Sequence, residues 1–256
     1  MPDNDPEPAP PNAALLLLCL CTGLVDSLTY VSSGVWCAFV TGTTIQLGMD
    51  IPIALSYLLS AKFQPDAFHR IASSSSSVRF ASLIGFLVGG HASSHSLLAT
   101  NPAISSTMQA ALLVLASTVI LSRAGTSPLV VGIPHAHITL PIVSASMAIQ
   151  AVLVQHYHTA YATSVAWTSV WLSIVTPSSA RSRLYKIAGL IVLIIGAGIG
   201  TVVLGRVDGD EQTESGEDRA RRVGWGLLAA AGIKLIAAVM FRVQRHKHIH
   251  EGRIHL

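Results

Sequence analysis

Residues 15–33 read LLLLCLCTGLVDSLTYVSS and contain one charged residue, Asp26. A helix rises about 1.5 Å per residue, so about 20 apolar residues cross a hydrocarbon core of about 30 Å. The stretch therefore predicts a membrane-spanning helix near the start of the chain. Further apolar windows follow, and with the first they make eight predicted segments: 14–33, 35–61, 78–100, 104–122, 129–155, 159–176, 187–204 and 223–241.

The composition extends this prediction to the whole chain. Of the 256 residues, 51% are apolar and 11% are charged, and the mean hydropathy is +0.56. A soluble domain carries about 25% charged residues. We therefore expect an all-α polytopic membrane protein, a helical bundle with about 6–8 hydrophobic segments and the lipid bilayer as its partner. The net charge of +3 comes largely from loops and the C-terminal tail, so nucleic acid is not an expected partner.

The predicted bundle occupies residues 14–243 as one domain. Residues 1–13 are acidic and Pro-rich and contain no Lys or Arg, which is the wrong charge for a signal peptide and indicates a disordered tail. The strongly hydrophilic loop covers 206–222, and residues 244–256 form a basic, His-rich tail. The composition does not indicate which cellular membrane holds this multi-pass protein, or its oligomeric state.

The second and fifth segments contain helix-breaking residues. Thr41-Gly42-Thr43 and Asp50-Ile51-Pro52 interrupt the second segment, so we expect it to be discontinuous. Pro134 and Pro141 predict that the fifth segment is kinked or starts late.

The chain divides into two halves of four segments, which predicts an internal two-fold repeat. The third segment carries Gly85 and Gly89, and the seventh carries Gly196 and Gly200 at the same spacing. Glycines four residues apart let helix backbones approach closely, so we interpret both pairs as helix-packing positions.

Basic loops orient a membrane protein. If all eight segments cross, the links after the second, fourth and sixth segments share a side with the basic tail, and that side should be cytoplasmic. If the second and sixth segments are re-entrant instead, six crossings remain and the basic loops fall on both sides. We take eight crossings as the prediction and six as the alternative.

Several short motifs carry a family resemblance. They are Gly23-Leu24-Val25-Asp26, Phe39-Val40-Thr41-Gly42-Thr43, Leu47-Gly48, Ser146-Met147-Ala148-Ile149-Gln150 and the stretch from Thr163 to Ser169. On these motifs the chain, from about Leu15 to Val243, resembles the YoaK-like membrane family, known as domain of unknown function 1275. The chain has Thr43 where that family has Asn, Ala148 where it has Gly, and Trp167-Thr168 where it has Thr-Gly. The resemblance implies a fold and a membrane location but no reaction.

Asp26 and Lys234 are the charges that lie deepest in their apolar windows. Each costs about 2.5 to 3.5 kcal/mol at a helix centre, so such residues pair with each other, face water or lose their charge. We predict that the two form an ion pair inside the bundle. The pair could be a coupling-ion site or a structural contact, and Lys234 could alternatively reach toward a headgroup.

A polar intramembrane site is the main functional candidate. Irregular backbone at membrane depth is tolerated only where protein or a water-filled cavity covers it, and broken segments mark binding sites in transporters. A notch in which Thr hydroxyls bond to their own helix is the alternative. The candidate residues are Asp26, Thr41, Gly42, Thr43, Gln46, Gln150 and Lys234.

Enzymatic readings have less support. His91 and His95 share a helix face, but no HxxHH box accompanies them, and no GxSxG motif, P-loop or dinucleotide fingerprint occurs. Cys19, Cys21 and Cys37 lie in apolar windows without zinc-ligand spacing. We therefore predict no enzyme, no cofactor and no metal. The prediction is a membrane protein that transports a small solute or ion, with a structural or regulatory membrane protein as the alternative and a membrane metalloenzyme as a distant third.

Overall fold

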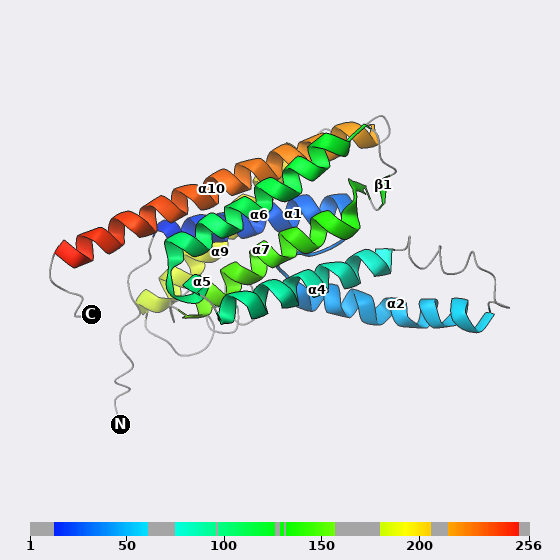
Figure 1. The fold of residues 1–256 in the computed structure, drawn as a ribbon, viewed down its shortest axis with the longest axis horizontal. Helices are drawn as coiled ribbons and strands as arrows, with labels where there is room; N and C mark the ends of the chain where they lie inside the picture. The colour runs from blue at the N-terminus through cyan, green and yellow to red at the C-terminus, as the bar shows by residue number, and fades with distance from the viewer. Residues whose placement is uncertain are drawn as a thin grey trace, which may run out of the picture.

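The computed structural model describes residues 13–60, 75–95, 97–125, 129–130, 132–156, 180–205 and 215–250. These residues form a helical bundle with one two-stranded hairpin (Figure 1). The helices are α1 (Ala13–Ser33), α2 (Val40–Ser60), α4 (Ser75–Ser94), α5 (Leu97–Thr100), α6 (Pro102–Arg123), α7 (Ala136–His156), α9 (Ala180–Val203) and α10 (Gly216–His250). The antiparallel strands are β1 (Leu129–Val130) and β2 (Ile133–Pro134).

Within the described residues, five helices are long and apolar enough to cross a bilayer. They are α1, α6, α7, the Ser182–Val203 part of α9 and the Gly216–Gln244 part of α10. The chain is therefore an all-α, multi-pass membrane protein, as its composition predicts. The predicted sixth segment, 159–176, lies outside the described residues, as do the predicted tail up to residue 12 and most of the hydrophilic loop.

Two predicted segments begin later than their apolar windows. The fifth starts as the β1–β2 hairpin, and α7 begins only at Ala136, which agrees with the late start predicted from Pro134. In the second, residues 34–39 are irregular and α2 then runs unbroken through Gly42 and Pro52. The breaks predicted at Thr41–Thr43 and at Asp50–Pro52 are therefore wrong, because the irregular backbone precedes the helix.

The directions of the helices decide between eight and six crossings. Gln150, near the end of α7, bonds to the Leu18 carbonyl near the start of α1, whereas Gly132, just before α7, packs against Ser32 at the end of α1. Helices α1 and α7 are therefore antiparallel. If all eight segments crossed, the first and fifth would run in the same direction, so the eight-crossing prediction is wrong.

The relation of α6 to α10 leads to the same result. Lys234 bonds to Gln109, while Ser117, two turns further along α6, bonds to the Gly224 carbonyl earlier in α10. These helices are antiparallel, although eight crossings would make the fourth and eighth segments parallel.

The remaining described helices also alternate in direction, and they include α4, which is not among the five helices apolar enough to cross. Gly196 and Gly200 of α9 meet Leu20 and Leu24 in the same order, so α9 runs parallel to α1. In the same way, Gly85 and Gly89 of α4 meet Pro141 and Ala145, so α4 runs parallel to α7. Direction thus alternates along α1, α4, α6, α7, α9 and α10. The basic links then fall at both ends of the bundle, and the orientation predicted from eight crossings loses its basis.

The helix contacts have an internal two-fold pattern. α1 packs on α9, and in the same way α7 packs on α4. α1 also packs on α10, as α7 does on α6. The remaining pair, α6 and α10, pack on each other. Exchanging α1, α4 and α6 with α7, α9 and α10 therefore reproduces these contacts, which are the most extensive in the bundle. Since matching helices run in opposite directions, the described helices form two inverted repeats of three helices each. The predicted internal repeat is present, in an inverted form.

Close helix contacts depend on the four glycines chosen from the sequence. A Cβ at Gly85 would collide with the backbone of Pro141, and one at Gly196 would collide with the carbonyl of Leu20. Gly89 and Gly200 have similar contacts with Ala145 and Ser27. Small residues let these backbones approach, in agreement with the predicted packing role.

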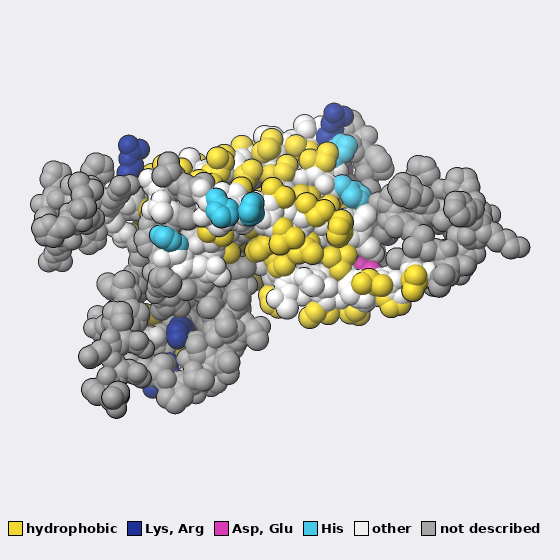
Figure 2. Space-filling view, turned by 60° about the horizontal axis from the view of Figure 1, so that its bottom comes forward, with side chains coloured by type: hydrophobic (Ala, Val, Ile, Leu, Met, Phe, Trp, Pro, Cys, Tyr) yellow, Lys and Arg dark blue, Asp and Glu magenta, His cyan; other side chains and the backbone are white. Residues whose placement is uncertain are grey.

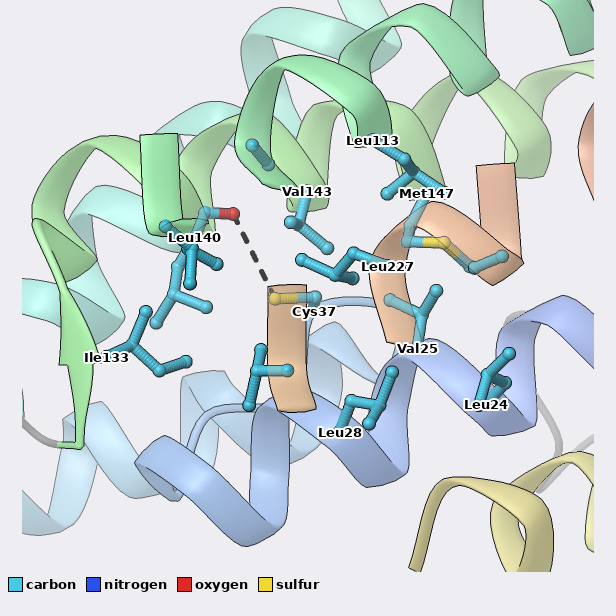
Figure 3. Packing of buried hydrophobic residues seen from close by; sticks show 14 of the residues in the cluster. Leu24, Val25, Leu28, Cys37, Leu113, Ile133, Leu140, Val143, Met147 and Leu227 are labelled. Atoms are coloured by element: carbon cyan, nitrogen blue, oxygen red, sulfur yellow. Dashed lines mark hydrogen bonds between the residues drawn. The ribbon is translucent and has the colours of Figure 1, made fainter. Parts of the chain in front are cut away.

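Apolar side chains both fill the core and cover the outside of the bundle. Figure 3 shows Cys37 among Leu28, Leu140 and Val143, where its thiol donates to the Leu140 carbonyl at 3.9 Å. In Figure 2, apolar side chains extend across the middle of the visible surface, and the His side chains lie toward its ends. An exposed apolar belt is the surface that lipid tails contact.

Candidate functional site

The predicted site residues fall into two separate places. Asp26, Thr43 and their neighbours hold the turn between α1 and α2, whereas Gln150 and Lys234 meet in the middle of the bundle.

Asp26 fixes the irregular backbone that precedes α2. Its Oδ1 accepts from the amides of Cys37 at 3.1 Å and Ala38 at 2.8 Å, and the side chain is buried. Asp26 lies seven residues before Ser33, the last residue of α1, so these amides lie about 10 Å below the end of that helix. The chain thus dips back into the bundle before α2 begins. Asp50 of α2 pairs with Arg79 near the start of α4, so α2 returns toward the end where α1 finishes.

The Thr-rich motif completes this re-entrant turn. Thr43 Oγ1 donates to the Trp36 carbonyl at 2.7 Å, and a Cβ at Gly42 would meet the rings of Phe39 and Trp36. Thr41 is exposed, and Gln46 Oε1 is buried without a hydrogen-bond partner in the described part of the chain. Asp26 therefore binds the amides of this turn, and Thr43 binds one of its carbonyls. Both residues shape the backbone there.

Lys234 occupies the centre of a second polar cluster. It lies near the middle of α10 with its side chain 0% exposed. Its Nζ donates to Gln109 Oε1 at 2.7 Å and to Gln150 Oε1 at 2.9 Å, with Met147 Sδ at 3.9 Å. Each of these contacts is electrically neutral, so among the described residues the ammonium group is held by dipoles.

The two glutamines connect the ammonium group to α1 and α6. Gln150 Nε2 donates to Thr22 Oγ1 at 2.7 Å and to the Leu18 carbonyl at 3.2 Å. Gln109 Nε2 donates to Ser105 Oγ at 3.0 Å. Helices α1, α6, α7 and α10 all contribute, so the cluster spans both inverted halves.

The predicted Asp26–Lys234 ion pair is wrong. The carboxylate is occupied by the Cys37 and Ala38 amides, and the ammonium by the two glutamine oxygens. Opposite charge and equal isolation in the sequence favoured the pair. Backbone amides and glutamine carbonyls satisfy each charge separately, and hydropathy windows contain no information about such neutral partners.

Thr22 and Gln109 were not predicted as site residues. Gln109 is the only amide side chain in the window 104–122, a signal as isolated as that of Lys234. Thr22 precedes Asp26, the aspartate of the G-x-x-D motif, by four residues on the same helix. Thr22 and Asp26 therefore lie on one face of that helix.

Histidines do not extend either cluster within the described residues. His91 and His95 are exposed, with ring centroids 4.9 Å apart. In the described residues no three His, Cys, Asp or Glu side chains come together in a way that could hold a metal ion.

The Lys234 cluster brings several hydrogen-bonding groups together inside the bundle. A buried ammonium, two amides that can turn either an oxygen or an N–H toward a ligand, and the Thr22 and Ser105 hydroxyls offer donors and acceptors at the centre of the bundle. Ser106 Oγ is also buried, without a hydrogen-bond partner in the described part of the chain.

Comparison with known proteins identifies the family. No curated protein and no solved structure matches the chain. The family model described as "Protein of unknown function (DUF1275)" matches residues 14–213. The match includes Thr22, Asp26, Gln109 and Gln150 but ends before Lys234, and so before the limit at Val243 that the sequence motifs predicted. The chain therefore belongs to the DUF1275 family.

Proposed function

We propose that this protein transports a small solute or ion across the bilayer, and that the Lys234 cluster is its binding site. The observation that carries the proposal is a lysine 0% exposed near the middle of a membrane helix, whose hydrogen bonds in the described part of the chain go to neutral groups from both halves of the bundle.

Burial of this charge supports a functional role. A cation at the centre of a membrane helix costs about 2.5 to 3.5 kcal/mol on insertion scales, and ionisable residues in such positions mark ion and substrate pathways. A methionine or leucine would fill the same space without that cost. A lysine at this position is therefore understandable if the charge acts on a ligand.

The architecture supports the same role. Transporters built from inverted repeats place their binding sites near the midplane, between the halves and beside irregular segments. Here the Gln109–Lys234 and Thr22–Gln150 bonds both join one half to the other. Asp26, which holds the irregular turn, lies one helical turn beyond Thr22 along α1. Rocking of one half against the other would thus open and close the cluster.

A structural or regulatory role is the second candidate. One observation favours it: the amides of Gln109 and Gln150 already use both their oxygen and their nitrogen within the protein. Such a saturated network also stabilises a bundle that never opens.

Uptake by reconstituted protein tests the proposal. Proteoliposomes would be offered radiolabelled panels of small anions, cations and neutral solutes, with and without a proton gradient. The test variant is Gln150→Leu, and its matched control is Gln155→Leu, an exposed residue five positions further along α7. Circular dichroism and size-exclusion profiles would establish that each variant is folded.

We expect the wild type and Gln155→Leu to take up at least one solute class and Gln150→Leu to lose most of that uptake. If uptake is unchanged in a folded Gln150→Leu variant, the transport site is not the Lys234 cluster. No uptake of any class by the folded wild type would favour the structural role.

A further inference from the structure

A groove of about 840 Å³ opens between the first half of α6 and the last apolar turns of α10. Its walls are mostly apolar, and small side chains at Ala103, Ala111 and Ala238 leave the space between the helices. Ile104, Met108 and Val239 line the groove and remain about half exposed, at 47%, 45% and 62%. In a membrane protein, this apolar surface faces lipid tails.

The end of the groove is cationic. Arg242 lines it, has an exposed side chain and is the first residue after the apolar stretch 223–241. Basic side chains at the end of an apolar helix reach toward the headgroups, so we assign the guanidinium group to that level. Asn101, which caps α6, adds a polar side chain to the same lining. Arg245 and Lys247 follow in the sequence, so positive charge continues along the chain.

We propose that this groove is a binding site for a glycerophospholipid with an anionic headgroup. An acyl chain lies between α6 and α10 against Ala111 and Ala238, and the phosphate lies against Arg242. Three features support this occupant: the apolar walls, the single-sign charge at the headgroup end, and the basic sequence that continues from it. Arginine matches phosphate with a planar pair of donors, and basic residues next to a membrane helix attract anionic lipids.

The site is separate from the Lys234 cluster and does not depend on transport. Gln109, on α6, is buried, whereas Met108 and Ala111 on the same helix face the groove. A lipid in the groove would therefore lie on the outer side of α6, the helix that carries Gln109.

Lipid binding to the purified, delipidated full-length protein tests the proposal. Native mass spectrometry would compare phosphatidylglycerol with phosphatidylcholine of the same acyl chains. The variants are Arg242→Gln, which removes the headgroup contact, and Ala111→Phe, which fills the groove. Arg183→Gln is the matched control, since Arg183 is an exposed arginine in the first turn of α9 and lies outside the groove.

We expect the wild type to bind phosphatidylglycerol about fivefold more tightly than phosphatidylcholine, the factor that one basic residue near a lipid surface supplies. Arg242→Gln should lose this preference, Arg183→Gln should keep it, and Ala111→Phe should weaken binding of both lipids. Equal binding of the two lipids by the wild type, or an equal loss in Arg183→Gln, would overturn the proposal. Inorganic phosphate that displaces phosphatidylglycerol at millimolar concentration would also overturn it, because the ligand would then be a free anion.

Discussion

Lys234 and Gln150 are joined by a 2.9 Å hydrogen bond from Nζ to Oε1, and the same amide continues through Nε2 to Thr22 on the opposite half of the bundle. A charge at the centre of the membrane is thus stabilised by an amide that also connects α7 to α1. Removing Gln150 should destabilise the fold more than removing Lys234 does. The first change leaves an ammonium group without one of its acceptors, whereas the second leaves only an amide without a donor.

Gln150→Leu should destabilise the protein by about 1.5 to 3 kcal/mol, the range for hydrogen bonds to charged groups. Lys234→Met has similar volume, leaves only neutral amides and should cost less. The double variant should recover part of the loss seen in Gln150→Leu, because no charge then remains. Thermal unfolding in detergent checks the order. A larger loss in Lys234→Met than in Gln150→Leu would show that the charge itself stabilises the fold.

Asp26 should behave as a backbone cap with no energetic link to Lys234. Asp26→Asn keeps an acceptor for the Cys37 and Ala38 amides and should be mild, whereas Asp26→Ala leaves both without it and should cost about 1 to 3 kcal/mol. In a double-mutant cycle of Asp26→Asn with Lys234→Met, the two effects should add within about 0.5 kcal/mol. A coupling energy well above that value would show that Asp26 and Lys234 interact, as the sequence suggested.

Two glycines of α9 offer a matched test of helix packing. A Cβ at Gly196 would collide with the Leu20 carbonyl, whereas one at Gly198 meets nothing within 4 Å. Gly196→Ala should therefore destabilise by about 1 to 3 kcal/mol, while Gly198→Ala should be neutral or stabilise by up to about 1 kcal/mol. Unfolding midpoints of the two variants check the difference. Similar midpoints would mean that α1 and α9 do not approach closely.

Six crossings place Ser122, at the end of α6, and Ser215, before α10, on the same side of the membrane. Eight crossings place them on opposite sides. Both residues are exposed, and single cysteines there would be labelled with an impermeant reagent in intact cells, in a background without the native cysteines. We expect both to be labelled or both to be protected, and Ser94→Cys at the other end to show the reverse. Labelling of only one of Ser122→Cys and Ser215→Cys would contradict the six-crossing arrangement.

Local patterns predicted the bundle well and its assembly less well. Apolar windows identified the crossing helices, the prolines predicted the late start of α7, and glycine spacing identified the contacts of α4 and α9. The direction of each helix in the bundle was not predictable in this way. A window of apolar residues has the same composition whether it crosses the membrane or, like the second segment, dips back. Gln150 and Lys234 both stood in the candidate set, and the structure joins them by a hydrogen bond that the sequence did not predict. Asp26 was joined to them wrongly, since backbone amides satisfy a carboxylate without any sequence signature.

Labelling of the native Cys21 tests the central claim, that the Lys234 cluster opens to water, without requiring knowledge of the solute. Cys21 is 0% exposed, donates to the Ala230 carbonyl and lies next to Thr22 in the sequence. Wild-type protein in native membranes would be treated with a small charged methanethiosulfonate, and the modified cysteine would be located by peptide mass spectrometry. Cys19, which belongs to a separate apolar cluster, is the internal control, and detergent-denatured protein shows full reactivity. We predict that Cys21 is modified and Cys19 is not. A Cys21 that stays unmodified in the native protein but reacts after denaturation would contradict the account and indicate a closed, structural bundle.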